Sequence, residues 1–171
     1  MGNGITFRPI ADDDLPFLFA VYAHTRLGEL SMAPWTEEQK IAFLRQQFHA
    51  QHTYYQQVFP SASFQVILLK DQPIGRLYVH QTPEELRIVD IALLPSARGR
   101  GIGGAILRDL MAAAAGTGQV VRIHVERENP ALRLYQRLGF QRIEDLGVYF
   151  LMEWMPPAGE LSQSSISSFG C

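Results

Sequence analysis

The sequence lacks the features that mark secreted, membrane-spanning and nucleic-acid-binding proteins. It has a single cysteine, Cys171, so no disulfide can form within the chain. No apolar run approaches the ~20 residues that cross a bilayer, and the N-terminus has no signal-peptide pattern. The 15 basic and 17 acidic side chains leave a net charge of -2, without a global positive field for nucleic acid or anionic lipid. We therefore expect a cytoplasmic protein that binds neither nucleic acid nor a membrane.

The length and the apolar content predict one domain. With 171 residues and 47% hydrophobic side chains, the chain can bury one sizeable core, since domains usually hold roughly 100 to 200 residues. We expect a single domain over residues 1–155 and a serine-rich tail over residues 156–171. The tail composition is typical of disorder, and a homodimer is one arrangement in which such a tail would find a surface to dock on.

Residue patterns in the first half predict a strand, two helices and three more strands. The alternation in ITFRPI, residues 5–10, indicates a strand, and the carboxylates of residues 12–14 suit the start of a helix. Thr36 and Gln39 have the spacing of a capping box, which predicts a second helix that ends near Tyr55. Three extended stretches then predict an antiparallel meander with a DQP turn after the first: FQVILLK, IGRLYVH and LRIVDIALL.

Helices and strands alternate in the second half. A helix is predicted after a glycine-rich segment, with these apolar residues on one face: Ile102, Ile106, Leu110, Met111 and Ala114. The run VVRIHVE predicts a buried strand. In NPALRLYQRLGF, Asn129 suits the N-cap of a short helix, Pro130 its first position and Gly139 the residue after its end. The runs FQRIED and VYFLMEWM predict two final strands.

The stretch RGRGIGG, residues 98–104, lies between a predicted strand and a predicted helix. A glycine-rich turn at this place lets backbone N–H groups point into one concavity, where the positive end of the helix dipole joins them to bind phosphate. Arg98 and Arg100 add positive charge at the rim. The alternative is a tight turn whose glycines only supply positive φ, but four glycines, two arginines and a helix start coincide here.

A dinucleotide is a second candidate ligand for this loop. Gly99, Gly101 and Gly104 satisfy GxGxxG, and Glu126 ends the next predicted strand, where dinucleotide sites carry an acid. Residues 95–98, however, separate the strand from the first glycine, where the dinucleotide fingerprint has a tight turn. An NAD(P)-binding oxidoreductase therefore stays an alternative.

The stretches VDIALLPSARGRGIGGAIL and IHVERENPALRLYQRLGF together resemble the GCN5-related N-acetyltransferase (GNAT) superfamily. The loop signature of that superfamily, (Gln/Arg)-x-x-Gly-x-(Gly/Ala), is filled by Arg98, Gly101 and Gly103. Its later pattern is a strand, an Asn, and a helix that carries a Tyr and ends in Gly-Phe. The matching residues are Val125, Asn129, Tyr135, Gly139 and Phe140.

The resemblance implies a fold and an activity. The fold is α+β, with three α/β/α layers and a mixed, mostly antiparallel sheet of about seven strands with about four helices. The activity is that of an acyltransferase with acetyl-CoA as co-substrate and no metal. The acetyl group would pass to a primary amine of a small molecule or peptide by direct attack through a tetrahedral intermediate. A coenzyme A-binding module without catalytic activity is a further alternative.

The resemblance also implies where the cofactor binds. Its pyrophosphate would bind backbone amides of the loop, and its pantetheine arm would pair as an extra strand with residues 91–93. A backbone N–H near Leu93 would then stabilise the oxyanion. The implied cofactor-binding residues are Ile91, Ala92, Leu93, Arg98, Gly99, Arg100, Gly101, Ile102, Gly103, Gly104, Asn129 and Tyr135.

The resemblance implies a catalytic acid, but it does not define the catalytic base. Tyr135 would lie near the cofactor sulfur, and a phenol of pKa ~10 can protonate a departing thiolate of pKa ~8.5. The alternative for Tyr135 is a core aromatic whose hydroxyl has some other partner. Some members of the superfamily carry a glutamate base on the fourth strand, but Arg87 takes that position here. Asp90 is then the first candidate base, with His124, Glu126 or ordered water as alternatives.

The acceptor site is implied only in outline. In the fold of that superfamily, the first two helices and the loop between them line the acceptor site. The residues in these places are Leu30 to Trp35, Tyr54 and Tyr55. These aromatic side chains could equally fill a core. No acidic cluster marks a site for a polyamine or an aminoglycoside, so the sequence names no substrate.

Overall fold

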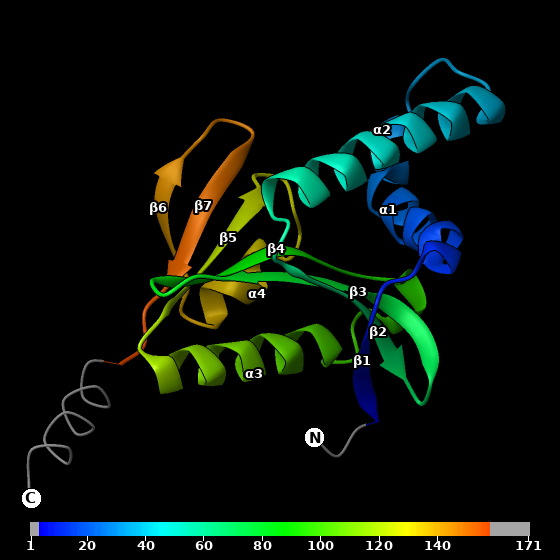
Figure 1. Ribbon diagram of the computed structural model, residues 1–171. Coiled ribbons are helices and arrows are strands. Elements are labelled where there is room, and N and C mark those ends of the chain that lie inside the picture. The colour runs from blue at the N-terminus through cyan, green and yellow to red at the C-terminus, as the bar shows by residue number, and fades with distance from the viewer. Residues whose placement is uncertain (1–3, 158–171) are drawn as a thin grey trace, which may run out of the picture. The chain divides into compact units, whose positions relative to one another are not determined.

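Seven strands and four α-helices make up the described part of the chain, residues 4–157, in the computed structural model (Figure 1). The strands are β1 (Ile5–Pro9), β2 (Ser63–Leu69), β3 (Gln72–Gln81), β4 (Glu85–Leu93), β5 (Val120–Glu126), β6 (Gln141–Asp145) and β7 (Tyr149–Trp154). The helices are α1 (Leu15–Leu30), α2 (Glu37–Val58), α3 (Ile102–Thr117) and α4 (Leu132–Arg137).

The strands form one mixed sheet in the order β1-β2-β3-β4-β5-β7-β6. β4 and β5 are parallel, and the pairs β1/β2, β2/β3, β5/β7 and β6/β7 are antiparallel. The predicted α+β class, with a mixed and mostly antiparallel sheet, is confirmed.

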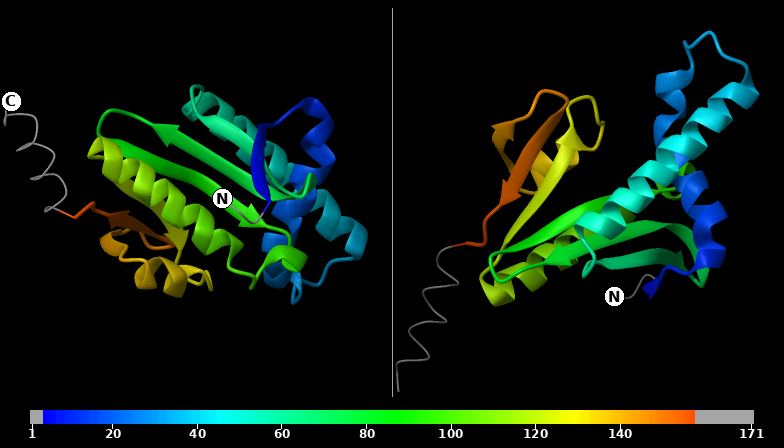
Figure 2. Two further views of the ribbon diagram at one scale, coloured as in Figure 1. Left: turned by 90° about the horizontal axis from the view of Figure 1, so that it is seen from below. Right: turned by 45° about the horizontal axis from the view of Figure 1, so that its top comes forward.

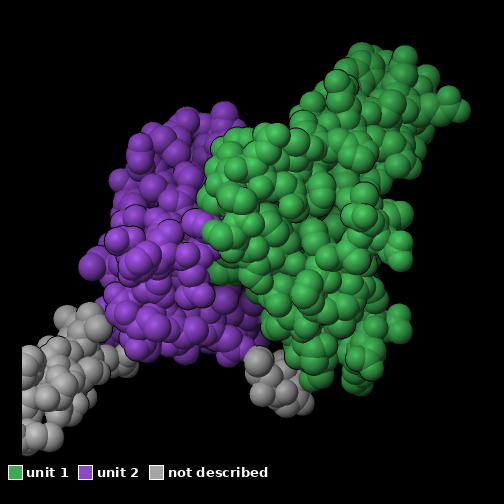
Figure 3. All heavy atoms as spheres, in the orientation of Figure 1, with its two compact units in different colours: residues 1–79, 90–100 green, residues 80–89, 101–171 purple. Residues whose placement is uncertain are grey.

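Two compact units divide the described residues, as Figure 3 shows by colour. The first contains residues 4–79 and 90–100, and the second contains residues 80–89 and 101–157. The predicted single domain over residues 1–155 stays a prediction. Residues 158–171, most of the predicted tail, lie outside the described residues together with Cys171.

In the first unit, α1 and α2 lie side by side, as Figures 1 and 2 both show. Four buried side chains form the core between them: Leu18, Tyr22, Leu44 and Phe48. The predicted capping box begins α2, because Thr36 Oγ1 accepts the N–H of Gln39 at 3.1 Å and Gln39 Oε1 accepts the N–H of Thr36 at 2.9 Å. α2 continues to Val58, beyond its predicted end near Tyr55.

The turn between β2 and β3 lies at Lys70 and Asp71, whose φ angles are 50° and 67°. The sequence places this turn at DQP, residues 71–73, which is one residue too late. A two-residue hairpin turn of this kind needs positive φ at both positions, and Asp tolerates it better than most residues. Gln72 therefore already begins β3.

β3 passes very close to the end of β4 at Gly75. A Cβ built on Gly75 would overlap the carbonyl oxygen of Ala92 and would lie 3.1 Å from the Cα of Leu93. Just beyond, Leu94 donates its N–H to the carbonyl of Ile74 at 2.8 Å. Because Gly75 has no side chain, β3 can hold the end of β4 at this short distance.

In the second unit, α3 packs on β5. The predicted apolar face of α3 is largely confirmed, since Ile102, Ile106 and Ala114 are buried and the two other predicted positions are half-buried. Leu107, which the pattern omits, is buried as well. This packing holds the first turn of α3 in place, directly after the glycine-rich loop.

Candidate functional site

The glycine-rich loop joins β4 to α3. After Leu93 the chain makes a short 3-10 turn, Pro95–Ala97, and α3 begins at Ile102. Gly99 and Gly101 have φ angles of 72° and 79°, which residues with a side chain rarely adopt. The predicted order of strand, glycine loop and helix is therefore confirmed.

The first turn of α3 is open to an anion. Its N-cap is Gly101, so no N-cap side chain bonds the free amides of this turn. A Cβ built on Gly99 or Gly101 would meet no atom within 4 Å, so the space beside both residues is open. α3 has 16 residues, and its dipole adds partial positive charge at this end. Together these features suit a phosphate group.

Arginine side chains surround the loop. Arg98 turns back and donates its Nε–H to the carbonyl of Leu93 at 3.0 Å, so it ties the loop to the end of β4. Arg100 is exposed, as expected for a residue at the rim. A third arginine, Arg108, lies one turn along α3 and brings its Nη1 to 3.4 Å from the Cβ position of Gly104. Sequence analysis did not include Arg108 among the candidate residues. The available signal was its position four residues after Gly104, which puts both residues on the same face of the helix.

α4 begins two residues later than predicted, at Leu132 rather than at Pro130. Asn129 still caps the turn before it, because its Oδ1 accepts the N–H of Ala131 at 2.8 Å. The carbonyl of Asn129 accepts the N–H of Leu132, three residues on, at 3.0 Å. The chain therefore makes one tighter turn before the regular helix, which explains the error. Gly139, with a φ of 101°, follows the helix as predicted.

Tyr135 lies within α4 and is only 4% exposed. Its ring packs edge-on against Phe140, with ring centroids 5.5 Å apart. α4 also lies against the first turn of α3, since the Cβ position of Gly104 is 3.8 Å from Leu134 Cδ1. The first turn of α3 and the helix that carries Tyr135 are therefore neighbours in the second unit.

Asp90 lies on β4 directly before residues 91–93, all of which are half-buried in the first unit. Its Oδ2 accepts a hydrogen bond from Arg76 Nη2 at 2.6 Å and a longer one from the Tyr55 hydroxyl at 3.4 Å. Its Oδ1 takes neither of these bonds. Because 16% of the Asp90 side chain is exposed, the carboxylate can be reached from solvent.

Arg76, on β3, carries a buried positive charge next to Asp90, because its side chain is only 3% exposed. Its Nη2 also donates to Gln51 Oε1 of α2 at 2.8 Å. Burial by itself would lower the pKa of Arg76, but the nearby charge of Asp90 raises it, so the guanidinium stays protonated. We call Gln51, Tyr55, Arg76, Tyr78 and Asp90 the Arg76 cluster.

Two polar atoms of the Arg76 cluster are buried and make no hydrogen bond of regular geometry with the described residues. They are Arg76 Nε and the Tyr78 hydroxyl oxygen. Burial raises the pKa of Tyr78 against the opposing effects of the Arg76 charge and of an interaction between the hydroxyl and the Arg76 guanidinium, so the hydroxyl is protonated at neutral pH. Burial and the charge of Arg76 lower the pKa of the neighbouring His52, which is therefore neutral.

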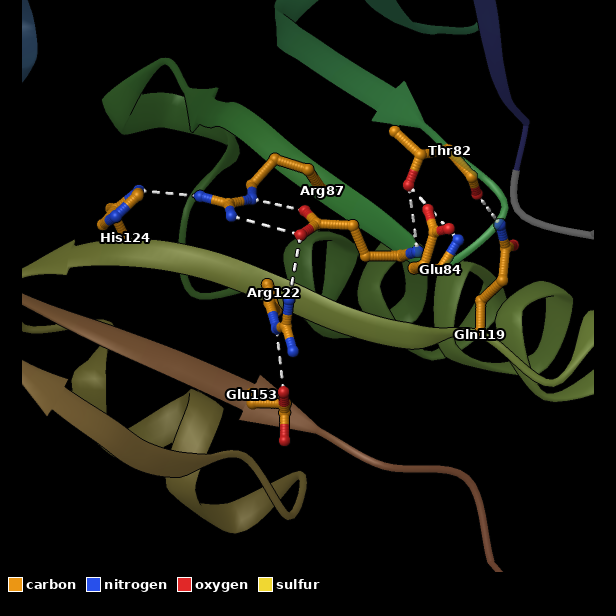
Figure 4. Close-up of polar contacts among 8 residues, drawn as sticks. Thr82, Glu84, Arg87, Gln119, Arg122, His124 and Glu153 are labelled. Atoms are coloured by element: carbon orange, nitrogen blue, oxygen red, sulfur yellow. Dashed lines mark hydrogen bonds and ion pairs between the residues drawn. The ribbon is translucent and has the colours of Figure 1, made fainter.

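A second charged cluster lies on β4, β5 and β7 of the second unit (Figure 4). Glu85 pairs with Arg87 at 2.7 Å and with Arg122 at 3.1 Å, and Arg122 also pairs with Glu153 at 2.8 Å. Arg87 Nη1 lies 3.1 Å from His124 Nδ1. Because a guanidinium only donates, Nδ1 is the acceptor, and the proton of the neutral ring is assigned to Nε2.

The tautomer assigned to His124 affects how well this ring can act as the catalytic base. Burial and the charge of Arg87 lower the pKa of His124, which keeps the ring neutral. Its one basic nitrogen, however, already accepts the bond from Arg87. Asp90 still has an oxygen outside its bonds to Arg76 and Tyr55, so it suits the role of base better than His124.

We predict that Glu85→Gln weakens the acid dependence of stability. Hydrogen bonds from Arg87 lower the pKa of Glu85 below its ordinary 4.5 against the opposing effect of burial, and Arg122 adds to this. The folded pKa lies below the unfolded one, so this stabilisation is present above about pH 4.5 and is lost as pH falls through the folded pKa. Thermal melts from pH 3 to 7 should show a lower melting temperature for Glu85→Gln at pH 7 and a smaller decline in acid.

The control for this measurement is Glu84→Gln, a neighbouring carboxylate that is exposed. Its melting curves should follow those of the wild type at each pH. If Glu85→Gln and Glu84→Gln behaved alike, the ion pairs of Glu85 would not contribute to stability.

The residues expected to wall an acceptor site have different surroundings. Tyr55 joins the Arg76 cluster through Asp90. Tyr54 is 56% exposed and Met32 is 92% exposed. Trp35 packs against Phe43, with ring centroids 5.2 Å apart.

Sequence analysis missed Arg76 as the partner of Asp90, and it missed Gln51 and Tyr78 as neighbours of Arg76. One signal was present, because Arg76 is a charged residue in the otherwise apolar stretch IGRLYV, and a charge in a buried strand must be paired. The partners come from α2 and β4, far along the chain, and the sequence carries no sign of that pairing.

Two features are absent from residues 4–157. No helix there is long and apolar enough to cross a membrane. The same residues contain no group of three or more His, Cys, Asp or Glu side chains placed to hold a metal ion.

Comparison with known proteins identifies similar sequences. Residues 60–142 match the family described as acetyltransferase (GNAT) domain. The N-alpha-acetyltransferase RimI of Mycobacterium tuberculosis is 42% identical over 62 residues. That segment covers 36% of this chain and 38% of RimI, so the chain matches well under half the length of this relative.

Solved structures share the fold at low sequence identity. The PaiA N-acetyltransferase of Thermoplasma acidophilum, in complex with coenzyme A, has a TM-score of 0.65 and 20% identity over 88% of this chain and 98% of that one. A GNAT family acetyltransferase of Elizabethkingia anophelis, with acetyl-CoA bound, has a TM-score of 0.56 and 18% identity over 90% and 99%. At these identities the likeness establishes the fold alone.

Proposed function

The chain belongs to the GNAT acetyltransferase superfamily, and from that premise we propose that it transfers the acetyl group of acetyl-CoA to a primary amine of a small molecule or peptide. The observation that carries the proposal is the open first turn of α3 behind two positive-φ glycines, because such a turn binds phosphate groups. The coenzyme A in the similar PaiA structure, and the N-alpha-acetylation for which RimI is named, support it.

Acetyl-CoA supplies the acetyl thioester, and the described residues fit the rest of that molecule. The free space beside Gly99 and Gly101 leaves room for the pyrophosphate on the amides of residues 98–104. Main-chain groups of residues 91–93 are proposed to pair with the pantetheine arm. Asn129, exposed before α4, is proposed to contact the same arm.

The proposed chemistry needs a base, an acid and an oxyanion donor from the protein. The amine nitrogen attacks the thioester carbon directly, and Asp90 Oδ1 takes the proton that the nitrogen loses. A main-chain N–H near Leu93 stabilises the negative charge on the thioester oxygen. As the C–S bond breaks, Tyr135 gives a proton to the sulfur, which leaves as the thiol of coenzyme A.

A ligand titration followed by a thiol assay tests this proposal. Acetyl-CoA and CoA are expected to stabilise the full chain, by about 2.7 kcal/mol at 100 times Kd, whereas NADH and NADPH leave the melting temperature unchanged. Thiol release should then require both acetyl-CoA and an added amine. Stabilisation by NADH or NADPH alone would favour the oxidoreductase alternative. Binding of acetyl-CoA without thiol release, for any amine of a broad panel, would favour the inactive module.

The remaining expectations belong to the same proposal. A cytoplasmic location, independence from metal ions and a homodimer stay predictions. Metal independence is checked by repeating the thiol assay with a chelator, which should leave the rate unchanged.

A further inference from the structure

We propose that Arg98 is a positioning residue, whose side chain holds the end of β4 so that the main-chain N–H of Leu93 is directed at the thioester oxygen. Arg98 then acts through a hydrogen bond to the backbone, and its charge is not needed to bind the pyrophosphate. The inference rests on the proposed acetyl transfer and adds a side chain that orients the oxyanion donor.

The direction of the main-chain groups of Leu93, the last residue of β4, follows from its two neighbours. Leu94 donates its N–H to the Ile74 carbonyl beside it at 2.8 Å, and the carbonyl oxygen of Ala92 lies where a Cβ on Gly75 would be. Residues 92 and 94 are therefore both directed at β3. Because successive residues of a strand direct their main-chain groups to opposite edges, the N–H and C=O of Leu93 lie on the other edge of β4.

This other edge of β4 is where the proposed cofactor arm has to pair. β3 is the neighbour of β4 on one side, so an arm that adds to residues 91–93 as an extra strand uses the edge away from β3. The Leu93 N–H on that edge is the proposed oxyanion donor. The Leu93 carbonyl, on the same edge, accepts the Nε–H of Arg98 at 3.0 Å. Arg98 therefore holds the strand at the place where the thioester is proposed to lie.

The peptide group between Leu93 and Leu94 is held at both of its polar atoms. Its oxygen accepts from Arg98, and its N–H donates to Ile74. The next carbonyl, of Leu94, accepts the N–H of the buried Ala97 at 2.9 Å. These bonds restrict the backbone angles of Leu93 and so fix the direction of its own N–H. An oxyanion donor needs such a fixed direction, because small misplacements of a catalytic group cost rate.

The atom of Arg98 that makes the bond distinguishes a donor from a charge. The bond comes from Nε, which is attached to Cδ, and it requires an N–H at this place rather than a full positive charge. Glutamine offers an uncharged N–H at the same place, because its amide nitrogen is also attached to Cδ. Lysine keeps the charge but has a methylene group there, and its ammonium lies one bond further out.

Three variants of Arg98 test the proposal with the full chain. Arg98→Gln keeps the donor, Arg98→Lys keeps the charge, and Arg98→Met keeps neither. The first measurement is kcat for thiol release at saturating acetyl-CoA, with the amine of the panel that the wild type acetylates fastest. The second is the Kd of coenzyme A by calorimetric titration at low and at high salt.

We expect the donor, and not the charge, to decide kcat. Arg98→Met and Arg98→Lys should both lower kcat roughly tenfold, whereas Arg98→Gln should stay within about twofold of the wild type. The Kd of coenzyme A should rise at most about threefold in any of the three. A residue that binds phosphate by its charge gives the opposite order: Arg98→Gln and Arg98→Met then lose affinity at least about tenfold, Arg98→Lys is spared, and the loss shrinks at high salt.

Infrared spectroscopy of bound acetyl-CoA tests the oxyanion donor without an acceptor amine. A hydrogen bond to the thioester oxygen polarises the carbonyl and lowers its stretching frequency, and an isotope label at the acetyl carbonyl carbon separates this band from those of the protein. On binding to the wild type we expect the frequency to fall. The same fall should persist in Arg98→Gln and should be smaller in Arg98→Lys and Arg98→Met.

Arg26→Met is the control with a matched change of charge. Arg26 pairs with Glu29 on α1 at 3.3 Å, so this variant removes one positive charge from a surface ion pair of the first unit. Its kcat, its Kd for coenzyme A and the carbonyl frequency should equal those of the wild type. Arg98 is exposed, so its variants should melt close to the wild-type temperature, and a loss of kcat is then not a loss of fold.

The possible results separate this role from the proposed function. If the wild type binds neither acetyl-CoA nor coenzyme A, the proposed function itself is wrong. If it binds them and Arg98→Lys keeps the wild-type kcat while Arg98→Gln loses affinity, Arg98 binds phosphate and the positioning role is wrong. If all three variants match the wild type in kcat and carbonyl frequency, the bond between Arg98 and Leu93 has no part in the reaction. If no amine of the panel reacts, the carbonyl frequency alone decides the role of Arg98.

Discussion

Replacing Tyr135 with phenylalanine is expected to lower turnover roughly 10²- to 10⁴-fold, while the affinity for acetyl-CoA stays within about twofold. Phenylalanine keeps the ring that packs edge-on against Phe140 and removes only the hydroxyl. Because the thiolate needs its proton as the C–S bond breaks, the loss falls on kcat rather than on binding. Steady-state thiol release measures turnover, and calorimetric titration with coenzyme A measures affinity.

Tyr22→Phe is the matched control for this variant. Tyr22 is also a buried tyrosine on a helix, 6% exposed, and its ring packs against Phe48. Its turnover should stay within about twofold of the wild type, because its hydroxyl has no proposed part in the reaction. Wild-type turnover in Tyr135→Phe would instead make Tyr135 a core aromatic, and another group would have to protonate the sulfur.

The second large effect is expected at Gly75. An alanine there should destabilise the protein by about 3 kcal/mol and lower the melting temperature by about 6 to 12 °C. The added Cβ would overlap the Ala92 carbonyl oxygen and crowd the Cα of Leu93. Because both of these are backbone atoms, neither can turn away as the end of a flexible side chain would. The displacement would fall on residues 91–93, so we also expect weaker binding of acetyl-CoA. Thermal melting and a titration with acetyl-CoA measure the two effects.

Gly28→Ala provides the contrast. Gly28 lies in α1, and a Cβ built there meets no atom within 4 Å. Alanine is the better helix former by about 1 kcal/mol, so this variant should be slightly more stable than the wild type. If Gly75→Ala melted at the wild-type temperature, β3 and β4 could separate at this point without cost, and the close approach would not be needed.

Local signals explain which parts of the fold and the site the sequence could predict. The capping box of Thr36 and Gln39 lies within four residues, and its two hydrogen bonds form as expected. The glycine-rich loop is equally local, since strand end, positive-φ glycines and helix start follow one another. Two local predictions, the position of the turn before β3 and the start of α4, are wrong by one or two residues, and turn geometry explains both. Asp71 adopts a positive φ and so belongs to the earlier turn, and a tighter turn at Asn129 delays α4.

Contacts between distant segments explain what the sequence could not predict. Asp90 was a candidate base among three, and only the pairing of β3, β4 and α2 gives it Arg76 and Tyr55 as partners. The same applies to His124, whose basic nitrogen is occupied by Arg87, 37 residues away along the chain. Neither pairing leaves a periodic pattern, because each depends on which side chains face one another across strands.

The sequence by itself determined the elements in their order, the absence of an internal disulfide and the glycine-rich loop at residues 98–104 between a strand and a helix. These follow from the conformational preferences and spacing of neighbouring residues, which act before any packing occurs. Only the tertiary structure decided that Gly75 must lack a side chain and that a buried guanidinium fixes one oxygen of Asp90. Steric overlap and ion pairing act over a few ångströms in space, so they depend on which distant segments the fold brings together.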